Sequence, residues 1–167
     1  TMLRYSELTA QAWGARLIVW PEAALPVLAS NIPDYLRRLK ELGRAHDADF
    51  AIGLVNYQAD TQRFYNGLLV LSDSGGGWYY KRHLVPFGEY FPVPDWLRPV
   101  MDVLGLPHSD LGFGAANQAP ITVDGQHVGV AVCFEDVFPD EDRRRAAQVS
   151  FMVNVTNDAW FGPCENP

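Results

Sequence analysis

Short apolar runs of strand length constrain the fold of this chain more than any other feature. Several of them are apolar throughout, which is typical of strands that are covered on both faces. The strands that we predict span residues 16–20, 50–57, 63–72, 77–83, 121–133 (a hairpin) and 149–157. The sequence therefore predicts buried strands at the centre of the fold.

Helical patterns alternate with these strands. The helices that we predict span residues 2–15, 31–49, 95–104 and 139–148. The second begins at a start signal, Asn31-Ile32-Pro33, in which proline suits the first turn of a helix. Residues 73–77 (Asp-Ser-Gly-Gly-Gly) and 124–125 (Asp-Gly) are hairpin signals. Strands that alternate with helices and also form hairpins indicate a layered α/β sandwich with mixed sheets.

Charge and composition exclude several classes of protein. The 167 residues carry a net charge of −7, which argues against non-specific nucleic-acid binding, because such binding needs a basic face. The four histidines are scattered and no Cys-x-x-Cys occurs, so we expect no metal site. No apolar run approaches the ~20 residues of a membrane-spanning helix, so we expect any membrane anchor to lie in sequence outside these residues.

Three predicted strands end in a polar residue that can carry chemistry. Glu22 follows the first strand in WPEAALP, Lys81 and Glu89 lie in YYKRHLVPFGEYFP, and Cys133 ends the apolar run of VAVCFED. Strand ends are where α/β folds gather catalytic groups. If these ends converge, the site holds a carboxylate, an ammonium and a thiol.

Such a set suits acyl transfer. A thiol is a poor nucleophile at neutral pH unless a base or a positive charge assists it. Glu22 can take the proton of the thiol, and Lys81 can favour the thiolate and stabilise an oxyanion. The backbone N–H of Phe134, next to the thiol, can supply a second oxyanion donor.

Each residue taken alone also has an ordinary structural explanation. Cys133 then packs in the core as a small apolar residue, or pairs with Cys164 in an oxidising compartment. Glu22 then caps a loop, and Lys81 is a solvated strand end. Glu89 and Glu135 by default lie on the surface. His83, close to Lys81, leaves a rival Cys–His pairing open.

Taken together, these motifs resemble the nitrilase superfamily and, within it, the apolipoprotein N-acyltransferases. The superfamily carries a Glu-Lys-Cys triad in this chain order, which Glu22, Lys81 and Cys133 match in their local motifs. The lysine and cysteine motifs, with TNDAWFG at 156–162, resemble the acyltransferases rather than the soluble amidases. The resemblance implies an αββα sandwich in which Glu22 is the base, Lys81 the oxyanion stabiliser and Cys133 the nucleophile.

The resemblance also implies supporting residues. Glu89 matches an additional carboxylate near the triad, and Phe134 and Glu135 match the two residues after the nucleophile. Many relatives carry Tyr where Phe134 stands.

The resemblance implies a reaction in the bacterial cytoplasmic membrane, with the catalytic domain on its periplasmic face. A fatty acyl chain moves from a phospholipid, through a thioester on the cysteine, to the N-terminal amine of a diacylglyceryl-cysteine apolipoprotein. No cofactor and no nucleic acid take part. The rival functions are a soluble nitrilase-type amidohydrolase and a non-catalytic binding domain.

The resemblance covers essentially the whole chain but only part of the family's domain. We expect residues 1–167 to be a catalytic domain that is incomplete at both ends. The transmembrane helices and the C-terminal part of the domain would lie outside it, and the chain by itself would be inactive.

Overall fold

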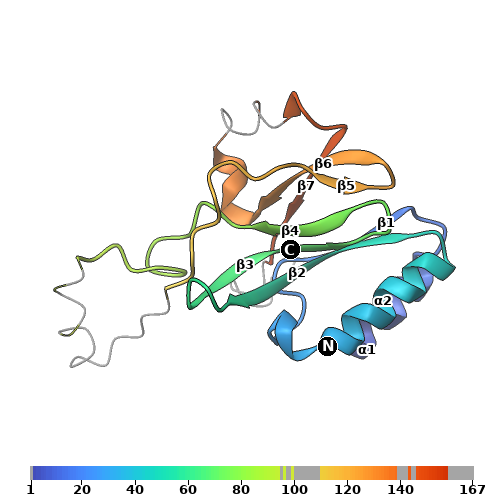
Figure 1. Cartoon of the computed structure of the whole chain (residues 1–167), viewed down its shortest axis with the longest axis horizontal. Coiled ribbons are helices and arrows are strands. Elements are labelled where there is room, and N and C mark those ends of the chain that lie inside the picture. Colours follow the sequence, from blue (N-terminus) through green and yellow to red (C-terminus); the bar gives the residue numbers. More distant parts are fainter. Residues whose placement is uncertain are drawn as a thin grey trace, which may run out of the picture.

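Two mixed β-sheets packed face to face form the centre of the molecule (Figure 1). The computed structural model describes residues 2–94, 96, 99, 110–138, 143 and 146–157. Its helices are α1 (Met2–Gln11) and α2 (Pro33–Ala45), with 3-10 helices η1 (Ala29–Asn31) and η3 (Cys133–Val137). Its strands are β1 (Leu17–Trp20), β2 (Asp49–Gln58), β3 (Arg63–Leu71), β4 (Gly76–Tyr80), β5 (Ile121–Val123), β6 (Gln126–Val132) and β7 (Phe151–Val155).

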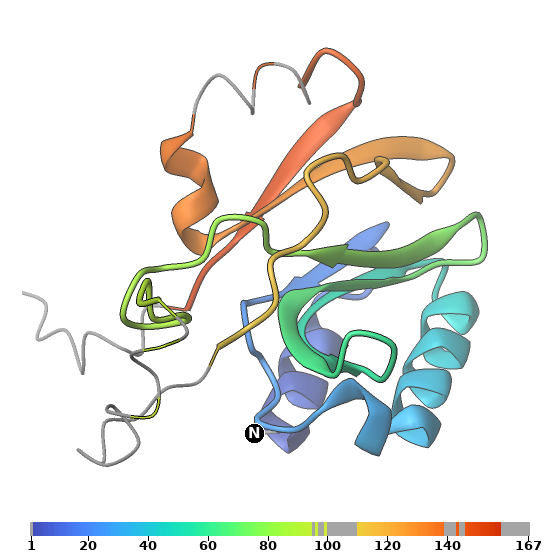
Figure 2. The same cartoon turned by 60° about the vertical axis from the view of Figure 1, so that its left-hand side comes forward.

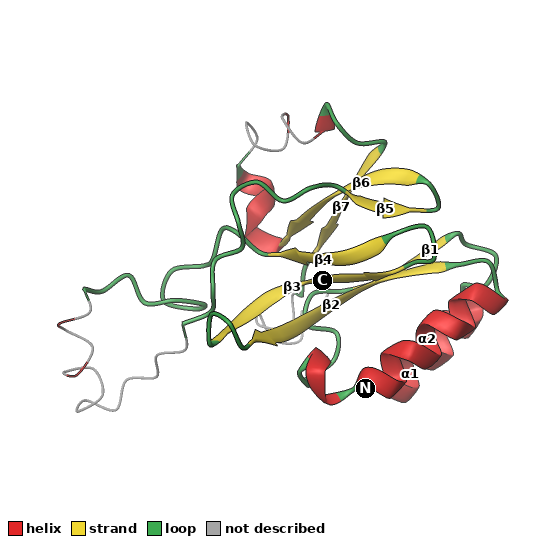
Figure 3. Cartoon of the chain, in the orientation of Figure 1, coloured by secondary structure: helices red, strands yellow, loops and turns green. Residues whose placement is uncertain are grey.

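Both sheets combine parallel and antiparallel pairs. The first has the order β1-β2-β3-β4, in which β1 runs parallel to β2 and the other two pairs are antiparallel. The second has the order β5-β6-β7, in which β5 and β6 form a hairpin and β7 runs parallel to β6. The predicted mixed sheets are therefore confirmed (Figure 3).

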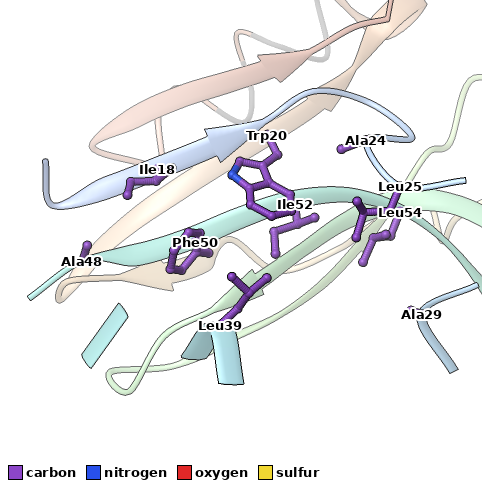
Figure 4. Close-up of a cluster of buried hydrophobic side chains, with 10 residues drawn as sticks. All are labelled: Ile18, Trp20, Ala24, Leu25, Ala29, Leu39, Ala48, Phe50, Ile52 and Leu54. Atoms are coloured by element: carbon purple, nitrogen blue, oxygen red, sulfur yellow. The ribbon is translucent and has the colours of Figure 1, made fainter. Parts of the chain in front are cut away.

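Helices α1 and α2 cover the outer face of the first sheet (Figures 1 and 2). Their core cluster includes Trp20, Leu39, Phe50 and Ile52, with the rings of Trp20 and Phe50 edge to face at 6.2 Å (Figure 4). Pro33 occupies the first turn of α2, as its start signal predicts. Fully burying one such apolar side chain contributes about 1.5–3 kcal/mol to the free energy of unfolding.

A second core lies between the two sheets. Side chains of β3 and β4, such as Leu68, Val70 and Tyr79, meet Val130 and Val132 of β6 there. The described residues thus form three layers of a sandwich, helices on sheet on sheet. The predicted helices 95–104 and 139–148 lie largely outside the described residues.

The β5–β6 hairpin forms at the predicted turn. Asp124 and Gly125 both have positive φ, 47° and 72°, which is the backbone of a two-residue type I′ turn. No helix in the described part of the chain is long and apolar enough to cross a membrane.

Several sequence expectations need correction. Val19 on β1 and Phe151 on β7 are 42% and 39% exposed, so full burial of these two strands was wrong. On β1 the physical reason is alternation: Ile18 and Trp20, 7% and 3% exposed, join the core under the helices, so Val19 between them points to the opposite face, where cover is incomplete. The first helix ends at Gln11 rather than near residue 15, and β4 ends at Tyr80, so that Lys81 is the first residue after the strand.

Candidate active site

A closed cluster of two carboxylates and one ammonium lies at the end of the first sheet. Lys81 Nζ is 3.1 Å from Glu22 Oε1, 3.0 Å from Glu89 Oε1 and 2.9 Å from Glu89 Oε2. Lys81 is 1% exposed and Glu22 6%. The structure therefore brings three of the predicted residues together, and the interpretation of Lys81 as a solvated strand end is wrong.

Gly53 on β2 lets Glu22 reach this cluster. The chain after β1 crosses β2 at this residue, where Ala24 N donates to Gly53 O at 2.9 Å. A Cβ on Gly53 would lie 2.1 Å from Pro21 O and 2.6 Å from Glu22 Cα, closer than atoms can approach. A side chain at position 53 would therefore push Glu22 away from Lys81.

Asn66 is a member of the cluster that the sequence did not single out. It lies on β3 and is 6% exposed. Its Nδ2 donates to Glu22 Oε1 at 2.6 Å and to Glu89 Oε1 at 3.0 Å. In the opposite orientation the amide oxygen of Asn66 would face two carboxylate oxygens, which are also acceptors. The carboxylates therefore require that the amide nitrogen, Nδ2, points toward them. The only available signal was a polar residue beside the apolar run GLLVL.

The two carboxylates control the charge of Lys81. Burial by itself lowers the pKa of this lysine, but attraction to Glu89 and then Glu22, with their hydrogen bonds, outweighs burial and raises the pKa above its ordinary value. Lys81 is therefore a permanent ammonium at neutral pH.

The oxygens of Glu22 and Glu89 are used differently. Glu89 Oε1 accepts from Asn66 and Lys81, and its Oε2 accepts from the Val85 backbone N–H at 2.8 Å. Within the described part of the chain, Glu22 accepts hydrogen bonds only through Oε1. Its other oxygen, Oε2, makes no hydrogen bond to any described residue. This oxygen is also not one of the fully buried side-chain atoms that lack a partner, so it is accessible. Glu22 is thus the carboxylate with an oxygen available to take a proton.

Cys133 lies on the second sheet, at the turn from β6 into η3. Its φ is 52°, a left-handed conformation that costs a residue with a side chain about 1–2 kcal/mol. It is a free thiol of intermediate exposure that packs against the core between the sheets. It is therefore not the fully buried cysteine of the structural explanation. Cys164 lies outside the described residues.

Glu135 is completely buried, so its expected place on the surface is wrong. Its Oε2 accepts from Val132 N at 2.8 Å, within the turn that carries Cys133. Its Oε1 accepts from Arg82 N at 2.8 Å, next to Lys81. One carboxylate thus joins the cysteine turn to the lysine segment.

The neighbouring aromatic side chains lie at the surface of this region. Phe134 is 39% exposed, and its ring meets Phe138 edge to face at 5.6 Å. The imidazole of His83, the histidine of the rival pairing, stacks on Phe138 with the ring centres 4.0 Å apart.

The thiol and the charge cluster remain separate groups. Among the described residues, no hydrogen bond joins Cys133 Sγ to Glu22 or Lys81. No group of three or more potential metal ligands occurs in the described part of the chain. The site therefore consists of two halves, an ionic cluster and a thiol on a strained turn.

Comparison with known proteins decides the family. The family model described as carbon-nitrogen hydrolase matches residues 1–167. The chain belongs to the carbon-nitrogen hydrolase family. The predicted membership of this superfamily is therefore confirmed.

Curated relatives at 32–40% identity carry the name apolipoprotein N-acyltransferase. The chain is 39% identical over 97% of its length to the apolipoprotein N-acyltransferase of Methylococcus capsulatus. It is 40% identical over its whole length to the enzyme of the same name from Nitrosomonas europaea. It spans 32% and 34% of these relatives, which is about one third of their length.

A solved structure supports the fold. The chain is similar to the carbon-nitrogen hydrolase of Helicobacter pylori G27, with a TM-score of 0.67 at 17% identity. The likeness covers 93% of this chain and 54% of that protein. At this identity it shows the fold alone, and it confirms the nitrilase-like mixed α/β class.

Proposed function

We propose that this chain forms part of the catalytic domain of an N-acyltransferase. The enzyme moves a fatty acyl chain from a phospholipid to the N-terminal amine of a diacylglyceryl-cysteine apolipoprotein. The names of the relatives from M. capsulatus and N. europaea support this reaction. Residues 1–167 then belong to a longer protein whose other segments hold the domain at the periplasmic face of the bacterial cytoplasmic membrane.

The first half-reaction loads the enzyme. Cys133 Sγ attacks the ester carbonyl of the phospholipid while Glu22 Oε2 takes the thiol proton. The tetrahedral intermediate collapses by breaking the carbon–oxygen bond. Glu22 returns the proton to the leaving oxygen, and a lysophospholipid departs. The acyl chain remains on Cys133 as a thioester.

The second half-reaction unloads it. The α-amine of the apolipoprotein attacks the thioester carbonyl, and Glu22 accepts a proton from the attacking nitrogen. The carbon–sulfur bond then breaks, the amide is released, and the proton returns to Cys133. Because both halves pass through an oxyanion at one carbonyl, a single oxyanion site serves both.

Lys81 supplies the positive side of that oxyanion site. An ammonium has three N–H donors, and one bond to each of Glu22 and Glu89 leaves the third for the substrate oxygen. The Phe134 backbone N–H supplies a second donor. Glu89 has both oxygens occupied, so it fixes and neutralises Lys81 rather than moving protons.

The observation that carries this proposal is the difference between the two carboxylates around Lys81. Of these two, Glu22 combines a bond to the ammonium with an oxygen, Oε2, that makes no hydrogen bond to any described residue. Acyl transfer needs a base that moves a proton and a positive charge that stabilises the oxyanion, both close to the same carbonyl carbon. Glu22 and Lys81 together supply these two groups.

The alternative is an amidohydrolase that acts on a small amide or nitrile with the same residues. The test uses the complete reading frame that carries this sequence, purified in detergent. It is given acyl-labelled phospholipid and a diacylglyceryl-cysteine peptide. We expect labelled triacylated peptide and an equal amount of lysophospholipid. Release of ammonia from small amides, without transfer to the peptide, would instead support the amidohydrolase.

A further inference from the structure

The two halves of the site come from different sheets. Glu22 and Lys81 follow strands of the first sheet, and Cys133 follows β6 of the second. Since no hydrogen bond within the described residues joins the thiol to Glu22 or Lys81, contacts between the sheets must set the spacing of nucleophile and base. A misplacement of about 1 Å at such a spacing can lower a reaction rate by about 100-fold.

Glu135 is the polar contact that crosses between the sheets at this point. It binds Val132 N within the cysteine turn and both Arg82 N and His83 N after β4. For these bonds to form, Oε2 must point to the cysteine turn and Oε1 to the segment after β4. The orientation of the carboxylate therefore determines how the cysteine turn sits against the lysine segment.

Tyr79 holds this carboxylate in its place. It lies on β4, two residues before Lys81, and is 4% exposed. Its hydroxyl is 3.0 Å from each oxygen of Glu135 and also accepts from Arg82 Nε at 3.2 Å. The last torsion of a glutamate is soft, so the carboxylate depends on its partners for its position. The Tyr79 hydroxyl, which Arg82 Nε holds in turn, limits how far the carboxylate can shift from Val132 N and Arg82 N.

The conformation of Cys133 needs this support. A left-handed backbone at a residue with a side chain persists only where the surrounding structure holds it. The bond from Val132 N to Glu135 Oε2 closes the turn around Cys133, and Tyr79 holds the same carboxylate from the other side.

We propose that Tyr79 is a positioning residue for the nucleophile, acting through Glu135 to set the place of Cys133 relative to Lys81 and Glu22. It touches no reacting atom. The proposal rests on the proposed role of Cys133 as the nucleophile, and it extends that role to a residue on the opposite sheet.

The test compares two tyrosines of the same strand in the complete reading frame. Tyr79→Phe removes the hydroxyl that binds Glu135, and Tyr80→Phe removes the neighbouring hydroxyl, which accepts from Asn56 Nδ2 at 2.7 Å. We expect Tyr79→Phe to lower kcat at least 10-fold and to leave KM within about twofold. Tyr80→Phe keeps kcat within about twofold. The thermal midpoint of each variant is measured alongside.

A double-mutant cycle tests the route of the effect. Because Tyr79 acts through Glu135, the Tyr79→Phe/Glu135→Gln protein is expected to be no slower than Glu135→Gln alone. Equal kcat values for Tyr79→Phe and Tyr80→Phe would overturn the proposal, and so would independent, multiplying effects in the double variant.

A second measurement separates this proposal from the proposed function. Alkylation of Cys133 by iodoacetamide, followed on its own peptide, needs no lipid substrate. We expect Tyr79→Phe to change this alkylation rate at least threefold, and Tyr80→Phe to leave it unchanged. An unchanged rate in Tyr79→Phe would overturn the positioning role. Absence of acyl transfer in the unsubstituted protein would overturn only the proposed function.

Discussion

The two sheets hold their parts of the site by different means. On the first sheet, Glu22, Asn66, Lys81 and Glu89 hold one another through side-chain hydrogen bonds and opposite charges. On the second, Cys133 depends on a left-handed backbone and on bonds made by Glu135. The comparison teaches that ion pairs and hydrogen bonds between side chains hold the ionic cluster in place. The position of the thiol depends instead on the backbone conformation of its turn. Substitutions should separate the two.

The largest effect is expected when the ionic cluster loses its cation. Lys81→Met leaves the buried carboxylate of Glu22 facing the half-buried one of Glu89, so we expect the free energy of unfolding to fall by about 3–5 kcal/mol and acyl transfer to be lost. Urea denaturation and the transfer assay measure both.

The control is Lys40→Met, which removes the chain's other lysine. Lys40 pairs with Asp73 at the surface, with its side chain 42% exposed. Its loss should leave the urea midpoint and the activity close to those of the unsubstituted protein. Equal sensitivity to the two substitutions would show that the buried cluster does not hold the first half together.

Glutamine at the two carboxylate positions should separate proton transfer from support. In Glu22→Gln the amide oxygen can still accept from Asn66 and Lys81, so this variant is expected to keep the fold and lower the rate by about 10²–10⁴-fold. Glu89→Gln turns an amide against the Val85 N–H or Lys81, so it should cost about 1–3 kcal/mol of stability with a smaller loss of rate.

Single-turnover acylation and thermal unfolding of both variants check this difference. If Glu89→Gln were the slower enzyme and the more stable protein, the assignment of base and supporting carboxylate would be reversed.

A smaller effect is expected at the contact between the sheets. Glu135→Gln replaces one acceptor oxygen by an NH₂ group, which is a donor. The groups that bind this carboxylate, Tyr79 OH, Arg82 N and Val132 N, donate to it, so one of these hydrogen bonds is lost. We expect acylation to slow by about 10–100-fold while the binding of phospholipid stays the same. Rapid-quench kinetics give the acylation rate. A variant that acylates at the normal rate would show that Cys133 holds its position without Glu135.

The smallest effects concern pH, and they differ between buried and exposed charges. The pKa of Lys81 is raised above its unfolded value, so its contribution to stability is complete below about pH 10.5 and disappears as pH rises through the folded-state pKa. The hydrogen bond from Arg44 lowers the pKa of exposed Asp73 from 3.8 to about 2, so its contribution is lost as pH falls through that range.

The acid slope of the free energy of unfolding against pH should therefore become shallower in Asp73→Asn, and the alkaline slope should become shallower in Lys81→Met. An unchanged acid slope in Asp73→Asn would show that this exposed pair contributes nothing measurable to the folded state.

The sequence predicted the elements of this fold better than their contacts. Apolar runs and the Asp124-Gly125 turn act locally, and the strands and the hairpin appeared where these signals placed them. The exposure of Val19 was missed because it depends on what covers the face of β1 opposite the helices. A local pattern carries no information about neighbours.

The candidate site was predictable only as a set of residue types at strand ends. Glu22, Lys81 and Glu89 meet as that pattern predicts. Asn66 and Gly53 were not predicted because their roles depend on contacts with Glu22, which is distant from them in the sequence. The burial of Glu135 likewise needs a partner sheet, which the motif around Cys133 does not describe.

Acylation of Cys133 tests the central claim most directly. The complete protein is incubated with acyl-labelled phospholipid and no acceptor, and the label is located on its peptides. We predict one labelled peptide, containing Cys133, that hydroxylamine strips and that disappears in Cys133→Ala. Label that persists in Cys133→Ala, or that maps to another residue, would contradict the account.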